Sequence, residues 1–202
     1  MSFRLKGCIV EINFFFFAVV AAASLGDTNG VLLCGILAAA VHEAGHLCVM
    51  LNIKELAPRK IKISPVGIKI IAGGSSEDSR YWCLAALAGV GANLLFSLAL
   101  LLPSLYFKSE VITKLILSNL LLAGVNILPA HSLDGGQLLK LLLKGRMSES
   151  GAETVLLIVS AVMLIPVLTL GVIILIKSQY NYSLLALSLW LVMIVFHSYL
   201  KK

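Results

Sequence analysis

Long apolar runs separated by short polar segments make up most of the chain. Runs of about 20 apolar residues are typical of membrane-spanning helices, and six can be drawn, at about 8–25, 31–51, 81–103, 111–129, 154–176 and 183–200. The first is the least regular, because Glu11 and Asn13 interrupt its start, and an early run behind basic residues could also be a signal peptide. No cleavage-like boundary before a soluble domain follows it, so we interpret it as a span. The sequence therefore predicts an all-α polytopic membrane protein with about six transmembrane helices.

A different pattern fills the polar segment between the second and third runs. Charged and aliphatic residues alternate over residues 60–71, on both sides of a Pro-Val-Gly sequence at 65–67. A period of two is typical of strands, so this segment predicts a short β-hairpin-like insertion at the cytoplasmic side or the membrane interface. An exposed strand of such a hairpin could pair with an extended peptide. The alternative is a basic interfacial loop without a sheet.

The composition fits a membrane protein and excludes an ordinary soluble domain. Hydrophobic residues make up 59% of the chain and charged residues 13%, and the mean hydropathy is +1.00. Once several spans are subtracted, 202 residues leave no room for a sizeable extramembrane domain, so we predict a single membrane-embedded domain over residues 1–202. The four cysteines have neither the CxxC spacing of a thiolate metal site nor the pattern of a disulfide framework.

The net charge of +6 has an explanation in the membrane that makes nucleic acid unnecessary as a partner. If the N-terminus is cytoplasmic, 13 of the 16 Lys and Arg residues lie in inner segments, and only Lys108, Lys114 and Lys177 lie in outer ones. Such an excess of basic residues on the inner side is typical of membrane proteins. It predicts that both termini are cytoplasmic.

Candidate chemistry is concentrated in the second apolar run, which contains the sequence His42-Glu43-Ala44-Gly45-His46. Two histidines four apart lie one turn apart on the same face of a helix, so both imidazoles can bind one metal ion. The glutamate between them can then act on a metal-bound water. Ionisable side chains within a membrane need a partner or a wet cavity, and a zinc ion is such a partner. The alternative is a chance occurrence of the HExxH pattern.

A catalytic zinc site needs a third protein ligand and an open position for water. Asp134, at the cytoplasmic end of the fourth run, is the acidic residue best placed for this, and the proline and paired glycines around it break the helix and let the backbone approach the metal. The same carboxylate could also cap a helix over residues 136–143. His131 could replace a ligand, although a histidine beside a metal site is more often a hydrogen-bond partner.

With these residues the chain resembles the site-2 protease family of intramembrane zinc metalloproteases. Three features stand in the family's order, namely HEAGH at 42–46, Gly89-Val90-Gly91-Ala92-Asn93 in the third run, and Asn126-x-x-Pro129 followed by Leu133-Asp134-Gly135-Gly136. These motifs define an expected catalytic core over about residues 30–145. Two positions depart from the family's usual pattern, because Val90 and Ser132 stand where proline is usual.

The resemblance implies a specific site and activity. Zinc would be bound by His42, His46 and Asp134, with Glu43 as general base and acid. Asn93 and Asn126 would contact the substrate backbone or the developing oxyanion. The expected reaction is hydrolysis of a peptide bond in or near the transmembrane segment of a substrate, which must unwind locally because a helix shields its carbonyl groups.

The small six-span architecture resembles the sporulation branch of this family, which processes a membrane-tethered sigma-factor precursor. That branch usually carries a C-terminal CBS domain, which these 202 residues do not include. The expected substrate is therefore a sigma-factor precursor or an anti-sigma factor. A single-span or membrane-tethered protein, the lipid bilayer and a membrane regulator are the expected partners, with no nucleic acid. The implied location is a bacterial cytoplasmic membrane, with the active site near the cytoplasmic side.

Two other functions could use the same residues. A membrane metal transporter or sensor would bind a passing ion without cutting a bond, and a catalytically silent homologue would only bind membrane clients. Glu43 distinguishes the first, because a transporter has no need of a carboxylate directed at a metal-bound water. The complete set of ligands and general base argues against the second.

Overall fold

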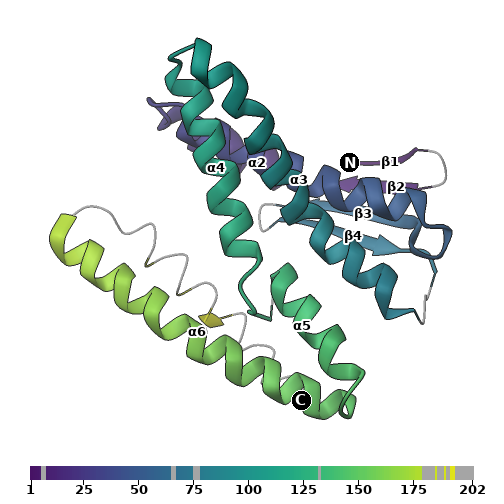
Figure 1. Ribbon diagram of the computed structural model, residues 1–202. Coiled ribbons are helices and arrows are strands. Elements are labelled where there is room, and N and C mark those ends of the chain that lie inside the picture. The colour runs from purple at the N-terminus through teal and green to yellow at the C-terminus, as the bar shows by residue number, and fades with distance from the viewer. Residues whose placement is uncertain are drawn as a thin grey trace. The chain divides into compact units, whose positions relative to one another are not determined.

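A computed structural model describes residues 1–5, 8–64, 67–74, 78–131 and 133–178, together with positions 185, 189, 192 and 193. The described chain is mostly helical and contains one small β-sheet (Figure 1). It divides into two compact units, Met1–Gly124 and Val125–Lys202. The sheet lies in the first unit, and the single membrane domain expected from the sequence stays a prediction.

The sheet has four strands in the order β1-β2-β3-β4. They are β1 (Ser2–Leu5), β2 (Cys8–Ile12), β3 (Pro58–Ser64) and β4 (Gly67–Ala72). The first two strands are antiparallel, β2 and β3 are parallel, and β3 and β4 are antiparallel. The last pair is the predicted hairpin, which is confirmed, with Ile61 opposite Ile70. Pro65 and Val66 of its predicted turn lie outside the described residues.

The two faces of the sheet differ in chemistry, because successive side chains of a strand point to opposite faces. One face is charged, since Glu11 lies opposite Lys62 and Lys62 lies opposite Lys69. The other face is apolar, and its Ile70 packs against the buried core of the first unit. The core residues are Met50, Leu56 and Ala85. The alternation that predicted the hairpin therefore separates a polar face from one that packs on helices.

The predicted span over residues 8–25 is wrong in its first part. Residues 8–12 form β2, and the helix that follows, α1 (Phe14–Leu25), has only 12 residues. At about 1.5 Å per residue this helix is roughly 18 Å long, shorter than the ~30 Å apolar core of a bilayer. Asn13 separates the two elements, because its Oδ1 accepts a hydrogen bond of 2.9 Å from the backbone N–H of Phe15. Pairing with β3 decides the structure of residues 8–12, and the fold is mostly helical rather than all-α.

Among the described residues, three helices are long and apolar enough to cross a membrane, α2 (Val31–Asn52), α3 (Ser79–Tyr106) and α6 (Glu149–Ser178). They coincide with the predicted runs at 31–51, 81–103 and 154–176, and they indicate an integral membrane protein. The helix α4 (Glu110–Asn126) occupies the fourth run but has 17 residues and is not one of the three. The predicted span at 183–200 lies mostly outside the described residues, so six spans stay a prediction.

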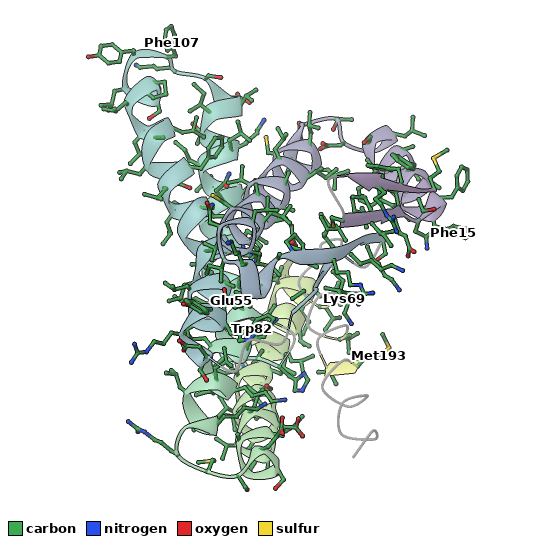
Figure 2. The ribbon with its side chains drawn as sticks, turned by 90° about the vertical axis from the view of Figure 1, so that its right-hand side faces the viewer. Phe15, Glu55, Lys69, Trp82, Phe107 and Met193 are labelled. Atoms are coloured by element: carbon green, nitrogen blue, oxygen red, sulfur yellow. The ribbon has the colours of Figure 1, made fainter. Side chains whose placement is uncertain are left out.

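In the first unit, α2 and α3 are the most extensively packed pair of helices. Gly45 permits this close packing, because a Cβ there would lie 2.5 Å from the carbonyl oxygen of Ala88. A short 3-10 helix, η1 (Lys54–Leu56), connects α2 to β3. The helix α3 begins at the sheet, where Trp82 packs against the buried core, and Phe107 follows its other end (Figure 2).

In the second unit, a loop after α4 leads to α5 (Asp134–Lys144), which packs against α6. The Nζ atom of Lys140 on α5 lies 2.7 Å from the carboxylate of Glu153 on α6. This ion pair is partly shielded from solvent, since both side chains are about one-third exposed or less. It fixes the side of α5 that faces α6.

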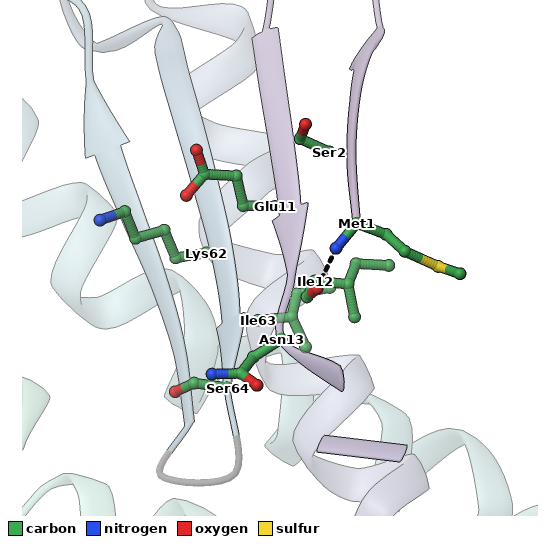
Figure 3. A pocket seen from close by; sticks show the side chains of 8 residues that line it. All are labelled: Met1, Ser2, Glu11, Ile12, Asn13, Lys62, Ile63 and Ser64. Atoms are coloured by element: carbon green, nitrogen blue, oxygen red, sulfur yellow. Dashed lines mark hydrogen bonds between the residues drawn. The ribbon is translucent and has the colours of Figure 1, made fainter. Parts of the chain in front are cut away.

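A shallow hollow of about 480 Å³ lies at the ends of the first three strands (Figure 3). It is lined by Met1, Ser2, Glu11, Ile12, Asn13, Lys62, Ile63 and Ser64. The Met1 amino group donates a hydrogen bond of 2.8 Å to the Ile12 carbonyl oxygen and so holds the N-terminus against β2. None of the predicted site residues lines this hollow.

Candidate metal centre

The two histidines of the HExxH motif meet at their outer ring nitrogens. Both lie on α2, one turn apart, and the Nε2 atoms of His42 and His46 are 3.1 Å from each other. The rings are nearly perpendicular, at 86°, with centroids 4.7 Å apart. His42 is buried and His46 is partly buried. The structure thus confirms that the motif brings the two imidazoles together on one helical face.

The hydrogen bond of the inner nitrogen fixes the tautomer of His46. Its Nδ1 lies 2.7 Å from the backbone carbonyl oxygen of Ala85 on α3. A carbonyl oxygen can only accept a hydrogen bond, so Nδ1 must carry the proton. In the neutral ring, Nε2 of His46 then holds a lone pair.

The tautomer of His42 is fixed in the same way through a side-chain amide. Its Nδ1 lies 3.0 Å from Oδ1 of Asn93 on α3. The orientation of this amide follows from its two other contacts, because Nδ2 of Asn93 lies 3.1 Å from the carbonyl oxygen of Ala38 and 2.9 Å from Oδ1 of Asn119. Oδ1 of Asn93 therefore accepts the Nδ1 proton of His42, and Nε2 of His42 also holds a lone pair.

Two lone pairs that face each other at 3.1 Å repel one another unless a cation lies against them. Zinc binds imidazole nitrogens at about 2.0–2.1 Å in tetrahedral geometry, which places two such nitrogens about 3.3 Å apart. The observed separation is close to this value. The histidine pair therefore fits a zinc ion, and the hydrogen bonds at Nδ1 favour the tautomer that a metal requires.

Gly89 on α3 leaves open the space beside these two nitrogens. A Cβ at this position would lie 2.5 Å from Nε2 of His46 and 2.8 Å from Nε2 of His42. Any larger residue would therefore occupy space at the metal-binding atoms. From the sequence, Gly89 was placed in the motif of the third apolar run without this role, and that motif was the signal available.

The other predicted residues of the first motif and the fourth run have clear positions. Glu43 follows His42 on α2 and is half-buried, and Asn126 is the last residue of α4 and also half-buried. Asn93 is fully buried, and its amide is hydrogen-bonded to His42, Ala38 and Asn119. The predicted contacts of Asn93 and Asn126 with a substrate stay predictions.

Asp134 lies in the second unit and is the first residue of α5. The N-cap position belongs to Leu133, so the alternative that Asp134 caps the helix is wrong. A carboxylate in the first turn of a helix is stabilised by the positive end of the helix dipole.

The glycines after Asp134 allow the loop to fold tightly on itself. A Cβ at Gly135 would overlap the carbonyl oxygen of Ile127, and one at Gly136 would overlap that of Ala130. Both glycines are buried. The predicted approach of this backbone to a metal stays a prediction, and the glycines here allow the loop to pack against its own carbonyl groups.

His131 takes part in the same loop through its backbone. Its N–H donates a hydrogen bond of 2.9 Å to Oγ of Ser160 on α6, and the Ser160 hydroxyl donates one of 2.6 Å to the Leu156 carbonyl oxygen. Burial, with a smaller contribution from Lys140, holds the pKa of His131 below its ordinary value. The imidazole is therefore mostly neutral at pH 7. The backbone N–H of His131 holds the loop through its bond to Ser160.

Three comparisons with known proteins bear on this description. Residues 108–169, less than half of the chain, match the family model described as Peptidase family M50. The matched segment includes Asn126 and Asp134 but not the HExxH motif. A comparison with curated proteins found no match.

A solved structure, the Site-2 Protease from Methanocaldococcus jannaschii, is similar over nearly the whole chain. The TM-score is 0.69, and the alignment covers 98% of this chain and 94% of that chain at 21% sequence identity. A likeness at this identity concerns the fold. The chain therefore shares the fold of that protease, and its segment 108–169 matches Peptidase family M50.

Proposed function

We propose that this chain is an intramembrane zinc metalloprotease that hydrolyses a peptide bond in or near the transmembrane segment of a membrane-tethered substrate. The observation that carries the proposal is the 3.1 Å separation of the Nε2 atoms of His42 and His46 on an apolar helix, with each Nδ1 bonded to an acceptor on α3. The match of residues 108–169 to Peptidase family M50 and the shared site-2 protease fold support it.

His42, His46 and Asp134 are proposed to hold the metal, because they offer two imidazole nitrogens and a carboxylate oxygen as donors. Three protein ligands leave a fourth position for water, as in other catalytic zinc sites. A zinc ion bound there would supply Lewis-acid chemistry, lowering the pKa of a water molecule and polarising the scissile carbonyl group.

Glu43 is the proposed general base and acid. Its carboxylate accepts a proton from the attacking water while the water oxygen forms a bond to the peptide carbon. The same proton passes to the departing nitrogen as the C–N bond breaks, so one carboxylate serves both steps. Asn126 is proposed to bind the substrate backbone, while the contacts of Asn93 support a role in orienting His42.

The substrate is proposed to be a single-span or membrane-tethered protein. β4 is an edge strand of the described sheet, and an edge can pair with an extended segment after a substrate helix unwinds. A sigma-factor precursor or anti-sigma factor, a sporulation role and a membrane regulator rest on the sequence resemblance. The excess of basic residues in inner segments supports cytoplasmic termini and an active site near the cytoplasmic side of a bacterial membrane.

The proposal is tested by reconstituting the full chain in liposomes with a single-span substrate. The wild type is expected to cleave it, whereas Glu43→Gln should keep zinc and lose cleavage, because an amide cannot accept the proton. Metal analysis of both proteins is the control. Cleavage by Glu43→Gln at the wild-type rate would refute the mechanism, and zinc uptake by the liposomes without cleavage would favour a transporter.

A further inference from the structure

Two asparagines are fully buried in the helical part of the first unit. Asn93 on α3 and Asn119 on α4 are both 0% exposed, and with Leu56, Leu156 and Ser160 they are the largest fully buried side chains of the described residues. A primary amide costs free energy to bury unless its hydrogen bonds are satisfied. Asn119 lies in the middle of an apolar helix and belongs to none of the motifs singled out in the sequence. Its presence therefore needs an explanation.

The two amides and His42 form a directed chain of hydrogen bonds. Nδ2 of Asn119 donates to the carbonyl oxygen of Leu115 at 2.8 Å, which leaves its Oδ1 to accept from Nδ2 of Asn93 at 2.9 Å. Asn93 in turn accepts the Nδ1 proton of His42 at 3.0 Å. The Leu115 carbonyl oxygen can only accept, so it sets the orientation of the Asn119 amide. Asn119 in turn sets that of Asn93, and Asn93 sets the position of the proton on His42.

The direction of this chain determines which His42 nitrogen is available to a metal. Both N–H groups of Asn93 have acceptors, namely the Ala38 carbonyl oxygen and Oδ1 of Asn119. These two acceptors prevent the amide of Asn93 from turning its nitrogen toward His42. If it did turn, Nδ1 of His42 would have to accept, and the proton would move to Nε2, where it would block metal binding.

We propose that Asn119 is a positioning residue for His42. It acts through Asn93 to hold the imidazole in the Nδ1–H form, with the Nε2 lone pair directed at Nε2 of His46. The inference rests on the proposed function in so far as zinc is the ion bound by these nitrogens. Hydrogen-bond partners of metal ligands commonly change metal affinity by about 10- to 100-fold when removed.

A purely structural role would be to join α3 to α4, and the chain offers a matched control for it. Ser97 lies one turn after Asn93 on α3, is buried, and donates a hydrogen bond of 3.5 Å to the Ile116 carbonyl oxygen of α4. It links the same two helices without contacting the chain of bonds that leads to His42. Ser97→Ala therefore removes a link between the helices and leaves the tautomer of His42 unchanged.

The test compares Asn119→Leu, Asn119→Asp and Ser97→Ala in the full-length protein. Leucine has a similar size but no acceptor, whereas aspartate keeps an oxygen that accepts from Asn93. The first measurement is ¹⁵N NMR of histidine-labelled, zinc-free protein, which reports the tautomer of each ring. The second is zinc affinity by competition with a chelator, supported by the absorption spectrum of the cobalt-substituted site.

In Asn119→Leu only the Ala38 carbonyl oxygen still holds the Asn93 amide. We expect this variant to convert His42 from a single Nδ1–H tautomer to a mixture and to weaken zinc binding about tenfold, the lower end of the effect of removing a direct partner of a ligand. Asn119→Asp should keep the Nδ1–H tautomer of His42, as in the wild type. Ser97→Ala should change neither the tautomer nor the zinc affinity. If Asn119→Leu does not fold, Asn119→Ala takes its place. The inference is overturned if the leucine or alanine variant keeps the single tautomer and binds zinc as Ser97→Ala does.

The zinc-free measurement separates this inference from the proposed function. If the wild type bound no zinc but Asn119→Leu changed the tautomer of His42, the hydrogen-bond chain would be upheld and the metalloprotease proposal refuted. If the wild type bound zinc and cleaved its substrate but the variant showed no tautomer change, only the role of Asn119 would be refuted, and the proposed function would stand.

Discussion

The histidine pair and the Asp134 loop are held in place by different means. His42 and His46 lie within one long helix, and each inner ring nitrogen is hydrogen-bonded to an acceptor on α3. Asp134 begins a short helix after a loop, and that loop is held by backbone contacts that its glycines permit and by a bond to Ser160. One part of the proposed donor set is thus fixed by side chains, and the other by backbone.

This difference indicates where each part is vulnerable. In the histidine pair, a change beside the rings should disturb metal binding and leave the helices intact, because α2 and α3 are packed together over long lengths. In the Asp134 loop, a change of backbone shape should disturb the metal and the local fold together. The predictions below test this distinction in order of expected effect.

The largest expected effect is that of Asp134→Ala. Loss of a proposed metal ligand should lower bound zinc and proteolysis together, on the order of 100-fold or more. His131→Ala should keep most of its zinc, because His131 contributes its backbone N–H to the loop and an alanine retains that group. Metal analysis of the purified proteins decides between the two. An empty site in His131→Ala with a filled one in Asp134→Ala would reverse the ligand assignment.

The next effect is that of Gly89→Ala. The added Cβ would lie 2.5 Å from Nε2 of His46, so we expect zinc affinity to fall at least about tenfold with little change in thermal stability. Gly91→Ala is the matched control on the same helix, because a Cβ there meets nothing within 4 Å in the described structure. Equal zinc affinity in the two variants would show that Gly89 does not border the metal site.

A smaller effect on zinc but a broader effect on structure is expected for Gly136→Ala. A Cβ here overlaps the Ala130 carbonyl oxygen, so the loop must change shape and the start of α5 should lose protection from hydrogen exchange. Gly145→Ala, at the other end of α5, is the control, since its Cβ would lie 3.7 Å from the Leu142 carbonyl oxygen, an ordinary contact. Hydrogen exchange unchanged at residue 134 and beyond in Gly136→Ala would contradict this account of the loop.

The smallest effect is expected for Ser160→Ala. This change leaves the partly buried N–H of His131 without its acceptor, which we expect to cost about 1 kcal/mol, the lower end of the range for a buried group. Thr169→Ala on the same helix removes the same kind of hydroxyl bond to a carbonyl oxygen four residues earlier, that of Ile165, but at an exposed position. We expect only Ser160→Ala to reduce thermal stability and zinc affinity, each modestly. Identical melting temperatures for the two variants would remove Ser160 from the account.

Local patterns in the sequence predicted those parts of the molecule that depend on neighbouring residues. The spacing of His42 and His46 within an apolar run predicted a helix with both rings on one face, and the alternation over 60–71 predicted the β3–β4 hairpin. Both patterns repeat with the period of the element that they form. The paired glycines predicted a break in the helix, and the contacts of Gly135 and Gly136 with carbonyl groups of the preceding loop follow that break.

The features that the sequence did not predict depend on distant partners. Residues 8–12 are apolar enough for a helix, and they become a strand because β3, about 50 residues later, pairs with them. Asn119 gave no local signal beyond being polar in an apolar run, since its role depends on Asn93 of another helix. The position of Gly89 beside the two imidazoles likewise appears only when α2 and α3 pack together.

The measurement that tests the central claim most directly is X-ray absorption spectroscopy of the zinc-loaded, full-length protein. We expect one zinc per chain, with two imidazole nitrogens at about 2.0–2.1 Å and oxygen donors at about 2.0–2.2 Å. The oxygen donors would be Asp134 and water. A sulfur donor, a single imidazole, or the same spectrum in His42→Ala and the wild type would contradict a zinc site built on His42, His46 and Asp134.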